Sequence, residues 1–297
     1  GSFKIDAENM HLFWYWAWER QNIYYKRNVL CLPKPWTEDL ILQNYKFTNV
    51  HRALDRTTVW YHKNIGSFSN EKDIVFATFF HRLFNNISTM EICLPLLTIK
   101  TFNFDKVIKI LKERRESGQN VFTTAHLTTG VCFAGSKDKL ENILHLMKLI
   151  HKEIDAIHHN IKNSKNLEDL YNQVIKVNGF GPFLGYQATL DFVNTGICKH
   201  SLNEFTVAGP GCKRGVRLIF PDPLELDFQE ALKYLTDSQN EYFDKFNFDY
   251  KFLPQFKEKG IPLSDIENCC CEFQKYYRSY IGKGQPKNKF QLKEVYR

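Results

Sequence analysis

Two carboxylates near a glycine-rich turn of this 297-residue chain are candidates for acid–base chemistry, and one amide beside them could position a substrate. Asp191 follows a glycine-rich turn closely, and Asn203 and Glu204 lie about twenty residues beyond the same turn. A carboxylate such as Glu204 can act as a general base or stabilise a cationic sugar, whereas the Asn203 amide can only position a substrate. Asp191 is a candidate for catalysis or, alternatively, an ordinary helix or pocket carboxylate.

The motifs of several other enzyme classes are missing. Gly130-Val-Cys and Gly282-Lys-Gly lack the residue order of a nucleotide-binding Walker loop, and no nucleophile elbow or zinc-deaminase signature is present. The eight cysteines, three of them consecutive at 269–271, do not have zinc or iron–sulfur spacing. We therefore expect no metal, no organic cofactor and reduced thiols.

The turn itself, Asn-Gly-Phe-Gly at residues 178–181, joins two amphipathic segments. Gly179 and Gly181 permit positive φ or close backbone approach, and Pro182 suits the first turn of the second helix. This is the helix-hairpin-helix pattern, in which free N–H groups at a helix N-terminus face a DNA phosphate. We therefore predict DNA contacts from Asn178, Gly179, Phe180 and Gly181; an ordinary turn between core helices is the alternative. In helix-hairpin-helix DNA glycosylases the catalytic carboxylate lies about twenty residues beyond the hairpin, where this chain has Asn203 and Glu204.

A second glycine-rich element and the C-terminal tail carry positive charge. Residues 209–215 read Gly-Pro-Gly-Cys-Lys-Arg-Gly, and exposed N–H groups there, with Lys213, Arg214 and Arg217, suit a phosphate. A tight turn with solvated charges is the alternative. The tail at 275–297 holds seven Lys or Arg residues against one Glu, nearly all of the net charge of +7. This asymmetry suggests a polyanion partner or a solvated tail.

Polar side chains on otherwise apolar helices predict a pocket. Burying such groups is costly unless they pair or bind a ligand. We expect the side chains of five residues to converge on a base-sized cleft: Arg52, Asp55, His81, Asn85 and Glu204. Tyr186 and Gln187, on the helix after the hairpin, are further pocket candidates. The alternative for Arg52 and Asp55 is an ion pair within a helix or a buried network.

Helical periodicity dominates the chain, with 43% hydrophobic and 25% charged residues. We expect helices over about 8–28, 47–62, 73–86, 104–116, 140–160, 167–176, 226–236 and 265–281, whereas 121–126 fits either a strand or a helix. The aromatic residues of 8–28, including Trp14 and Trp18, favour core over a base-stacking platform. The fold class is all-α or nearly so. We expect a single unit over 1–297, divisible into lobes of about 1–160 and 161–260 with the basic tail. No membrane span or signal peptide is visible, which favours an intracellular protein, nuclear in a eukaryote and cytoplasmic in a bacterium or phage.

Several stretches in this order resemble a known family. They are Lys34-Pro-Trp-Thr-Glu-Asp, Tyr45-Lys-Phe-Thr-Asn-Val-His-Arg-Ala-Leu-Asp, Phe80-His-Arg-Leu-Phe-Asn, Gly179-Phe-Gly-Pro-Phe-Leu-Gly-Tyr-Gln, Ala208-Gly-Pro-Gly-Cys-Lys-Arg-Gly and Ile266-Glu-Asn-Cys-Cys-Cys-Glu-Phe-Gln-Lys-Tyr. Together they are similar to the helical domain associated with 5-hydroxymethyluracil DNA kinases, within the glycosylase-like group of thymine-hypermodification enzymes. The resemblance covers roughly residues 13–297.

The resemblance implies a helix-hairpin-helix DNA glycosylase-like fold that acts on, or recognises, a modified thymine in double-stranded DNA through a flipped-base pocket. Those kinases carry a P-loop domain that is absent here, so kinase activity by this chain alone does not follow. His51 and Ala53 stand where the family pattern Asn-Val-Tyr-Arg-Glu-Leu-Asp has Tyr and Glu. A glycosylase-like or base-hypermodifying enzyme is the leading hypothesis. The alternatives are a non-catalytic reader of modified DNA and a helical scaffold that binds protein through an exposed Trp14–Trp18 face.

Overall fold

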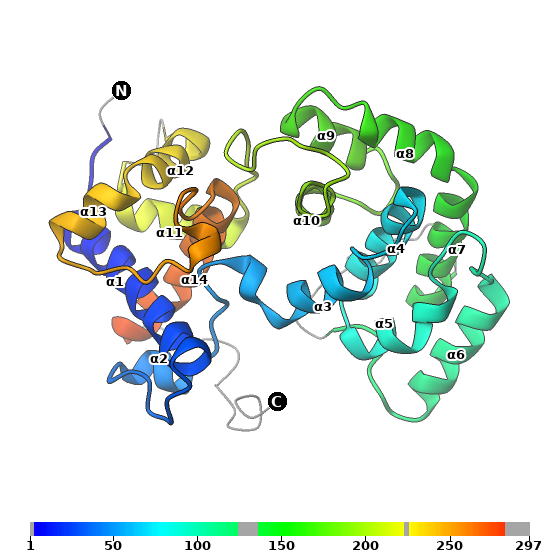
Figure 1. Cartoon of the computed structure of the whole chain (residues 1–297), viewed down its shortest axis with the longest axis horizontal. Helices are drawn as coiled ribbons and strands as arrows, with labels where there is room; N and C mark the ends of the chain where they lie inside the picture. Colours follow the sequence, from blue (N-terminus) through cyan, green and yellow to red (C-terminus); the bar gives the residue numbers. More distant parts are fainter. Residues whose placement is uncertain (1–2, 124–135, 223–225, 283–297) are drawn as a thin grey trace. The chain divides into compact units, whose positions relative to one another are not determined.

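The computed structural model describes residues 3–123, 136–222 and 226–282, and within these ranges it is built from helices and contains no strand (Figure 1). The α-helices are α1 Ala7–Tyr24, α2 Leu40–Asn44, α3 Arg56–Asn64, α4 Glu71–Phe84, α5 Ile87–Cys93, α6 Phe104–Glu116, α7 Lys139–Lys152, α8 Ile154–Lys162, α9 Leu167–Val174, α10 Pro182–Asn194, α11 Pro210–Ile219, α12 Phe228–Asp237, α13 Gln239–Lys245 and α14 Leu263–Tyr280. Short 3-10 or π turns are η1 Tyr25–Val29, η2 Arg52–Leu54, η3 Leu94–Leu96 and η4 Pro254–Phe256. The expected all-α class is confirmed. Of the undecided segment 121–126, residues 121–123 are irregular and the rest lie outside the described ranges.

The chain forms two compact units. Unit 1 comprises Gly1–Asp55 and Phe205–Arg297, and unit 2 comprises Arg56–Glu204. Unit 1 is discontinuous in sequence: its N-terminal and C-terminal helices pack on each other, and the residues of unit 2 lie between them along the chain. These bounds differ from the lobes of 1–160 and 161–260 expected from the sequence.

The core of unit 1 is aromatic. Helix α1 packs on α11 and α14, and the rings of Phe13, Trp14 and Trp16 are fully buried there. Trp18 is half-buried, stacks on Phe248 with a centroid distance of 4.9 Å and donates its indole N–H to a backbone carbonyl. The prediction that these rings form core is confirmed, and the exposed Trp14–Trp18 face needed by the scaffold alternative does not exist.

Helix α4 is the centre of unit 2. It packs against α5, α7, α8 and α10, and four of its phenylalanines are fully buried: Phe76, Phe79, Phe80 and Phe84. Within residues 74–84 every side chain of this helix except Arg82 is accordingly buried. His81, which the sequence suggests as a pocket residue, is only 1% exposed.

Two expected helices are interrupted. Residues 47–62 do not form one α-helix, because Asp55 is extended (ψ 141°) and separates the 3-10 turn η2 from α3. Residues 140–160 divide at Glu153 into α7 and α8, and the buried Ile150 and Ile154 flank this break. Both interruptions let short segments turn so that their apolar side chains reach the core, a tertiary effect that periodicity does not report.

Candidate functional site

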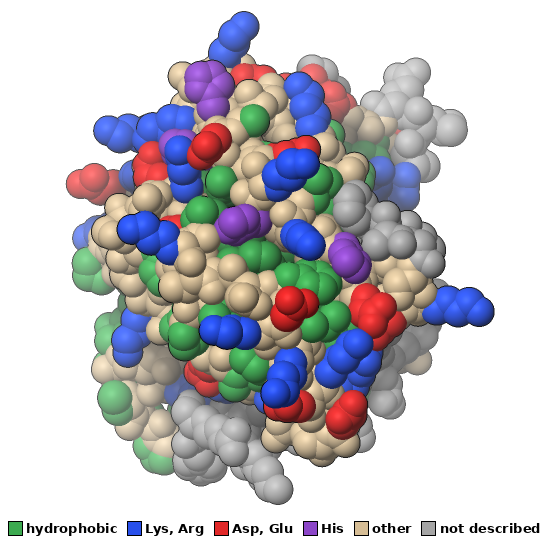
Figure 2. Space-filling view, turned by 90° about the vertical axis from the view of Figure 1, so that its right-hand side faces the viewer, with side chains coloured by type: hydrophobic (Ala, Val, Ile, Leu, Met, Phe, Trp, Pro, Cys, Tyr) green, Lys and Arg blue, Asp and Glu red, His purple; other side chains and the backbone are tan. Residues whose placement is uncertain are grey.

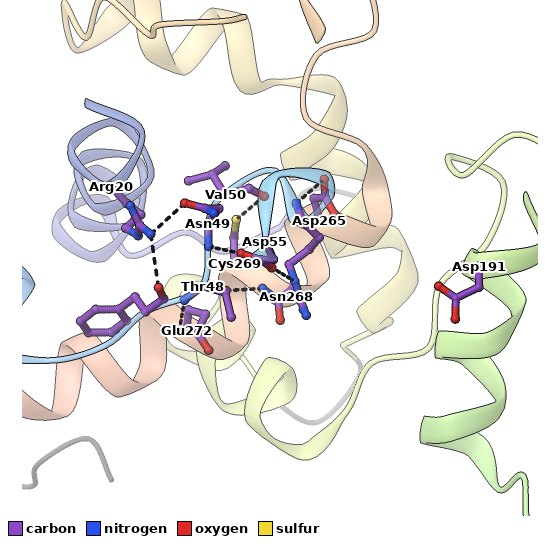
Figure 3. Close-up of polar contacts among 12 residues, drawn as sticks. Arg20, Thr48, Asn49, Val50, Asp55, Asp191, Asp265, Asn268, Cys269 and Glu272 are labelled. Carbon is purple, nitrogen blue, oxygen red and sulfur yellow. Dashed lines mark hydrogen bonds and ion pairs between the residues drawn. The ribbon is translucent and has the colours of Figure 1, made fainter. Parts of the chain in front are cut away.

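In unit 1, the segment 48–55 is bound along α14 by polar contacts (Figure 3). The backbone N–H of Thr48 donates to the carboxylate of Glu272 over 3.1 Å, and the amide of Asn268 donates to the Thr48 hydroxyl over 2.8 Å. The thiol of Cys269 lies 3.9 Å from the Val50 carbonyl oxygen. One face of α14 therefore replaces the internal hydrogen bonds that an irregular segment lacks.

Arg52 and Asp55 form the ion pair given above as an alternative to a pocket. Arg52 donates its Nε–H to Asp55 over 2.6 Å, and the other Asp55 oxygen accepts the N–H of Asn49 over 3.0 Å. Arg20, from α1, in turn donates to the Asn49 side-chain oxygen over 2.8 Å. The Asp55 carboxylate thus holds the segment 49–55 in shape, through a 3-10 turn and not an α-helix.

Two carboxyls on α14 close to Arg52 have unusual acidity. Asp265 is buried and accepts the N–H of Arg52 over 3.4 Å, and Glu267 accepts the N–H of Gly209 over 3.2 Å. Burial raises the pKa of Asp265 to about 7, although Arg52 opposes this, and burial likewise raises the pKa of Glu267 to about 7. Groups with such pKa values can gain or lose a proton near neutrality. The sequence does not distinguish Asp265, because an acidic residue in the first turn of a helix is ordinarily explained by the helix dipole, and it carries no signal for Glu267.

His51 is a buried member of the same segment. Its Nε2 lies 2.8 Å from the Tyr250 hydroxyl, and its ring stacks on Phe256 with a centroid distance of 4.3 Å. Burial lowers the pKa of His51 to about 4, so the ring is neutral at physiological pH. The residue that departs from the family pattern is therefore a packed core residue here.

The glycines of the element 209–215 have a packing role. Residues 210–219 form α11, and its Gly211 and Gly215 face α14. A Cβ atom at Gly215 would collide with the Cys270 carbonyl oxygen, and one at Gly211 would lie 2.5 Å from the Cys271 sulfur. The element is thus a helix in close contact with α14, and not the exposed loop of N–H groups expected from the sequence.

The basic residues of α11 lie beside a ring. Lys213 Nζ and the Arg217 guanidinium lie 5.4 Å and 5.1 Å from the centroid of Phe228, within cation–π range. Arg214 is exposed. A role of these three residues in binding phosphate remains a prediction.

In unit 2, the segment 178–181 makes a tight connection between α9 and α10 (Figure 1). Gly179 has a φ of 87°, and the backbone N–H of Phe180 donates to the Val177 carbonyl over 3.1 Å. The Phe180 ring is buried against Phe79, whereas Asn178 is exposed. Gly181 precedes α10 as its N-cap, without a side-chain cap. The local geometry leaves the first N–H groups of α10 without side-chain capping, as the hairpin interpretation requires.

The carboxylate of Asp191 is committed to an ion pair. Arg82, on α4, donates to its two oxygens over 2.6 Å and 2.8 Å. The side chains of Arg82 and Asp191 are 17% and 5% exposed. Such a bidentate pair fixes α10 on α4. Because both Asp191 oxygens accept hydrogen bonds from Arg82, the carboxylate is poorly available to a substrate.

Glu204 and Asn203 lie at the end of unit 2 and are both exposed. One Glu204 oxygen accepts the N–H of Leu167 over 2.9 Å, at the start of α9. The backbone N–H of Asn203 donates to the Ser201 hydroxyl over 3.2 Å. Glu204 therefore serves as a cap for α9, where a negative charge is favourable.

The remaining pocket candidates in unit 2 have separate surroundings. His81 stacks on Tyr61 with a centroid distance of 5.3 Å, and Asn85 ends α4 in a left-handed conformation with φ 47°. On α10, Tyr186 is buried and Gln187 is half-buried. Because Arg52 and Asp55 belong to unit 1 and the others to unit 2, the expected convergence of the five side chains stays a prediction.

The surface charge of unit 2 is mixed. On the face that carries α6, α7 and α8, Lys and Arg side chains alternate with Asp and Glu around apolar ones (Figure 2). Across the described ranges, no three His, Cys, Asp or Glu residues are grouped as metal ligands. In the same part of the chain, no helix has both the length and the apolar character to cross a membrane.

The helices and buried polar network define an all-α protein of two units, and comparison with known proteins specifies its family. The profile described as "5-hmdU DNA kinase, helical domain" matches residues 7–285. A curated relative, a 5-hmdU DNA kinase of Bacillus phage SP10, is 30% identical over 305 residues, which cover 93% of this chain and 47% of that protein. No solved structure matches.

The chain therefore belongs to the family of 5-hmdU DNA kinase helical domains. It spans about half the length of the curated relative it matches. The resemblance drawn from the sequence motifs is confirmed.

Proposed function

We propose that this chain recognises 5-hydroxymethyluracil in double-stranded DNA and takes part in the enzymatic modification of that base. The observation that carries the proposal is the family match over residues 7–285, which includes the hairpin, the segment 48–55 and α14. Because the proposed partner is DNA, we expect the protein to act inside the cell.

The hairpin is the proposed contact with the DNA backbone. Gly179 gives the turn its positive φ, Phe180 anchors it in the core, and α10 begins without a capping side chain. A DNA phosphate at this position would accept the free N–H groups and interact favourably with the helix dipole. Lys213, Arg214 and Arg217 on α11 are proposed as additional phosphate contacts, because Arg214 is exposed and the other two hold their charges over a ring.

For chemistry on the base, we propose a glycosylase-like or base-modifying reaction through a flipped-base pocket. Among the carboxylates named from the sequence, Glu204 has the better access, because it is exposed whereas both oxygens of Asp191 bind Arg82. Asn203 beside it would position the substrate. The buried Asp265 and the half-buried Glu267 supply a second set of candidate acid–base groups, since their pKa values lie near 7.

The alternative is a reader that binds modified DNA without chemistry. The occupation of Asp191 by Arg82 and the capping role of Glu204 favour it, because both carboxylates have structural partners.

Binding and turnover measurements on matched duplexes test the proposal. The duplexes carry a single thymine, 5-hydroxymethyluracil or phosphorylated 5-hydroxymethyluracil, and turnover is followed by mass spectrometry of the digested nucleosides. We expect tighter binding to one of the two modified duplexes than to the thymine duplex. Turnover lost in Glu204→Gln, with binding retained, would support the enzyme, and selective binding without turnover would support the reader. Equal affinity for all three duplexes contradicts the proposal.

A further inference from the structure

Unit 2 contains a surface pocket next to the hairpin, and of its lining residues only Asn178 is used by the functions above. It lies between α7, α8 and the end of α9, and its volume is about 320 Å³. That is the lower end of the range for small-molecule sites. The partly exposed Leu149 and Ile157 contribute apolar surface, and Glu153, Asn160 and Asn178 contribute polar groups.

Three polar side chains of this pocket are available to a ligand. Glu153, Asn160 and Asn178 are exposed, and within the described part of the chain their side chains make no hydrogen bond or ion pair. Each Asn amide can donate and accept at once, and the Glu153 carboxylate accepts. The ligand should therefore be flat or compact, with an apolar face and donors and acceptors along its edge.

A nucleobase has these properties. Amide side chains form paired hydrogen bonds with base edges, and every base has a π-face that can lie on apolar surface. The pocket is also continuous with the proposed backbone contact, because Val177 and Asn178 line the pocket and lead directly into the hairpin. Lys176, which also lines it, adds a positive charge suited to the phosphate of the same nucleotide.

We propose that this pocket binds the base of an unstacked nucleotide in the strand that the hairpin holds. The inference rests on the proposed DNA binding and adds to it a base-binding site in unit 2. This site is distinct from the pocket expected around Arg52, Asp55, His81, Asn85 and Glu204, and only Asn178 is shared with the residues selected from the sequence.

The experiment fills the pocket and measures base binding separately from DNA binding. Ala156, on α8, is exposed and lines the pocket, so Ala156→Phe should occupy it without disturbing the core. His159→Phe adds the same ring at an exposed position of α8 outside the pocket and is the matched control. Thermal unfolding of both variants checks that the fold is kept.

Two readouts are used with the full chain. The first is binding of thymidine and of 5-hydroxymethyl-2′-deoxyuridine, followed by NMR chemical-shift changes. The second is the fluorescence of 2-aminopurine placed at successive positions of a duplex, because the fluorescence rises when that base leaves the stack. We expect Ala156→Phe to weaken nucleoside binding by about tenfold or more and to abolish the fluorescence rise, with His159→Phe like the wild type.

The outcomes separate the two proposals. The pocket assignment is overturned if wild type and Ala156→Phe show equal nucleoside binding and equal 2-aminopurine fluorescence. This holds even if the protein binds the 5-hydroxymethyluracil duplex with high affinity. If the wild type binds no duplex at all, the proposed function fails. The claim that the base belongs to a strand held by the hairpin then fails as well. Nucleoside binding still decides whether the pocket binds a base.

Discussion

At the residue scale, Asp191 and Glu204 differ in what occupies their carboxylate oxygens. Both lie at distances from the hairpin that suggested catalysis, yet sequence spacing does not show which other side chains reach them. Arg82, 109 positions away from Asp191, takes both of its oxygens. Arg82, the partner of Asp191, belongs to the motif Phe80-His-Arg-Leu-Phe-Asn. A single sequence, however, contains no pattern that indicates a contact between Arg82 and Asp191.

The ion pair predicts an asymmetric effect of substitution. Asp191→Ala should lower the free energy of unfolding by about 3–5 kcal/mol, because it leaves Arg82 buried without a partner. Arg82→Met combined with Asp191→Leu should recover most of that loss, since apolar residues of similar volume remove both charges. Urea denaturation of the two variants measures the difference. Equal stability of Asp191→Ala and wild type would contradict a structural role and favour catalysis.

Asp265 predicts a pH dependence whose sign can be worked out. Its pKa is about 7 in the folded protein and 3.8 as the ordinary value, so its contribution to stability is present below about pH 4 and is lost as the pH rises through 7. Asp265→Asn removes this titration and can still accept the N–H of Arg52. The variant should therefore gain stability relative to wild type between pH 4 and 7, by up to about 1.4 kcal/mol per pH unit.

Chemical denaturation at several pH values between 4 and 8 measures this difference. The titration of His51 is common to both proteins and cancels in the comparison. A stability difference that is constant over the window would show that the carboxyl keeps its ordinary pKa.

At the element scale, the contact between α11 and α14 depends on glycine for a reason that composition alone did not reveal. The motif Gly-Pro-Gly-Cys-Lys-Arg-Gly suggested a loop that binds an anion. Glycine and basic residues are common both in such loops and in a helix of this kind. The actual cause is the spacing of Gly211 and Gly215, four residues apart on one helix face, which admits Cys270 and Cys271 of α14. The existence of most helices could be predicted from periodicity, whereas helix breaks such as that at Glu153 and helix contacts depend on partners distant in sequence.

This contact predicts different outcomes for two glycine substitutions. Gly215→Ala should destabilise unit 1 by about 1–3 kcal/mol or more, because its Cβ meets the rigid backbone of Cys270. Gly211→Ala would clash with the Cys271 sulfur, while its contact with the Arg214 side chain at 3.8 Å is ordinary, so Cys271→Ala in the same protein should relieve the clash. A double-mutant cycle on thermal or urea unfolding tests the coupling. Rescue of Gly215→Ala by Cys271→Ala, or no rescue of Gly211→Ala, would contradict this packing.

At the scale of the whole molecule, the discontinuous unit 1 explains why the division of the chain was hard to predict. Residues of α1 hydrogen-bond with residues more than 200 positions away, such as Trp18 with Asp249 and Gln21 with Lys251. Such pairings follow from tertiary packing and leave no local pattern at the junctions after Asp55 and Glu204. The family, by contrast, could be predicted, because its motifs are short, contiguous and occur in order.

The net charge of +7 suggests a polyanion partner, and the salt dependence of DNA binding measures how much of that attraction α11 supplies. Each phosphate contact that is lost should lower the slope of log affinity against log salt by about one unit. Lys213→Ala with Arg214→Ala should therefore flatten the slope by up to about two units on a 5-hydroxymethyluracil duplex and weaken binding at low salt.

Lys106→Ala with Lys109→Ala, on the exposed face of α6, removes the same charge and is the matched control. We expect a smaller change in the control, because a charge outside the interface acts only through the long-range field. If both pairs of substitutions change the slope equally, α11 contributes only net charge, and if neither changes it, Lys213 serves the fold through its contact with Phe228.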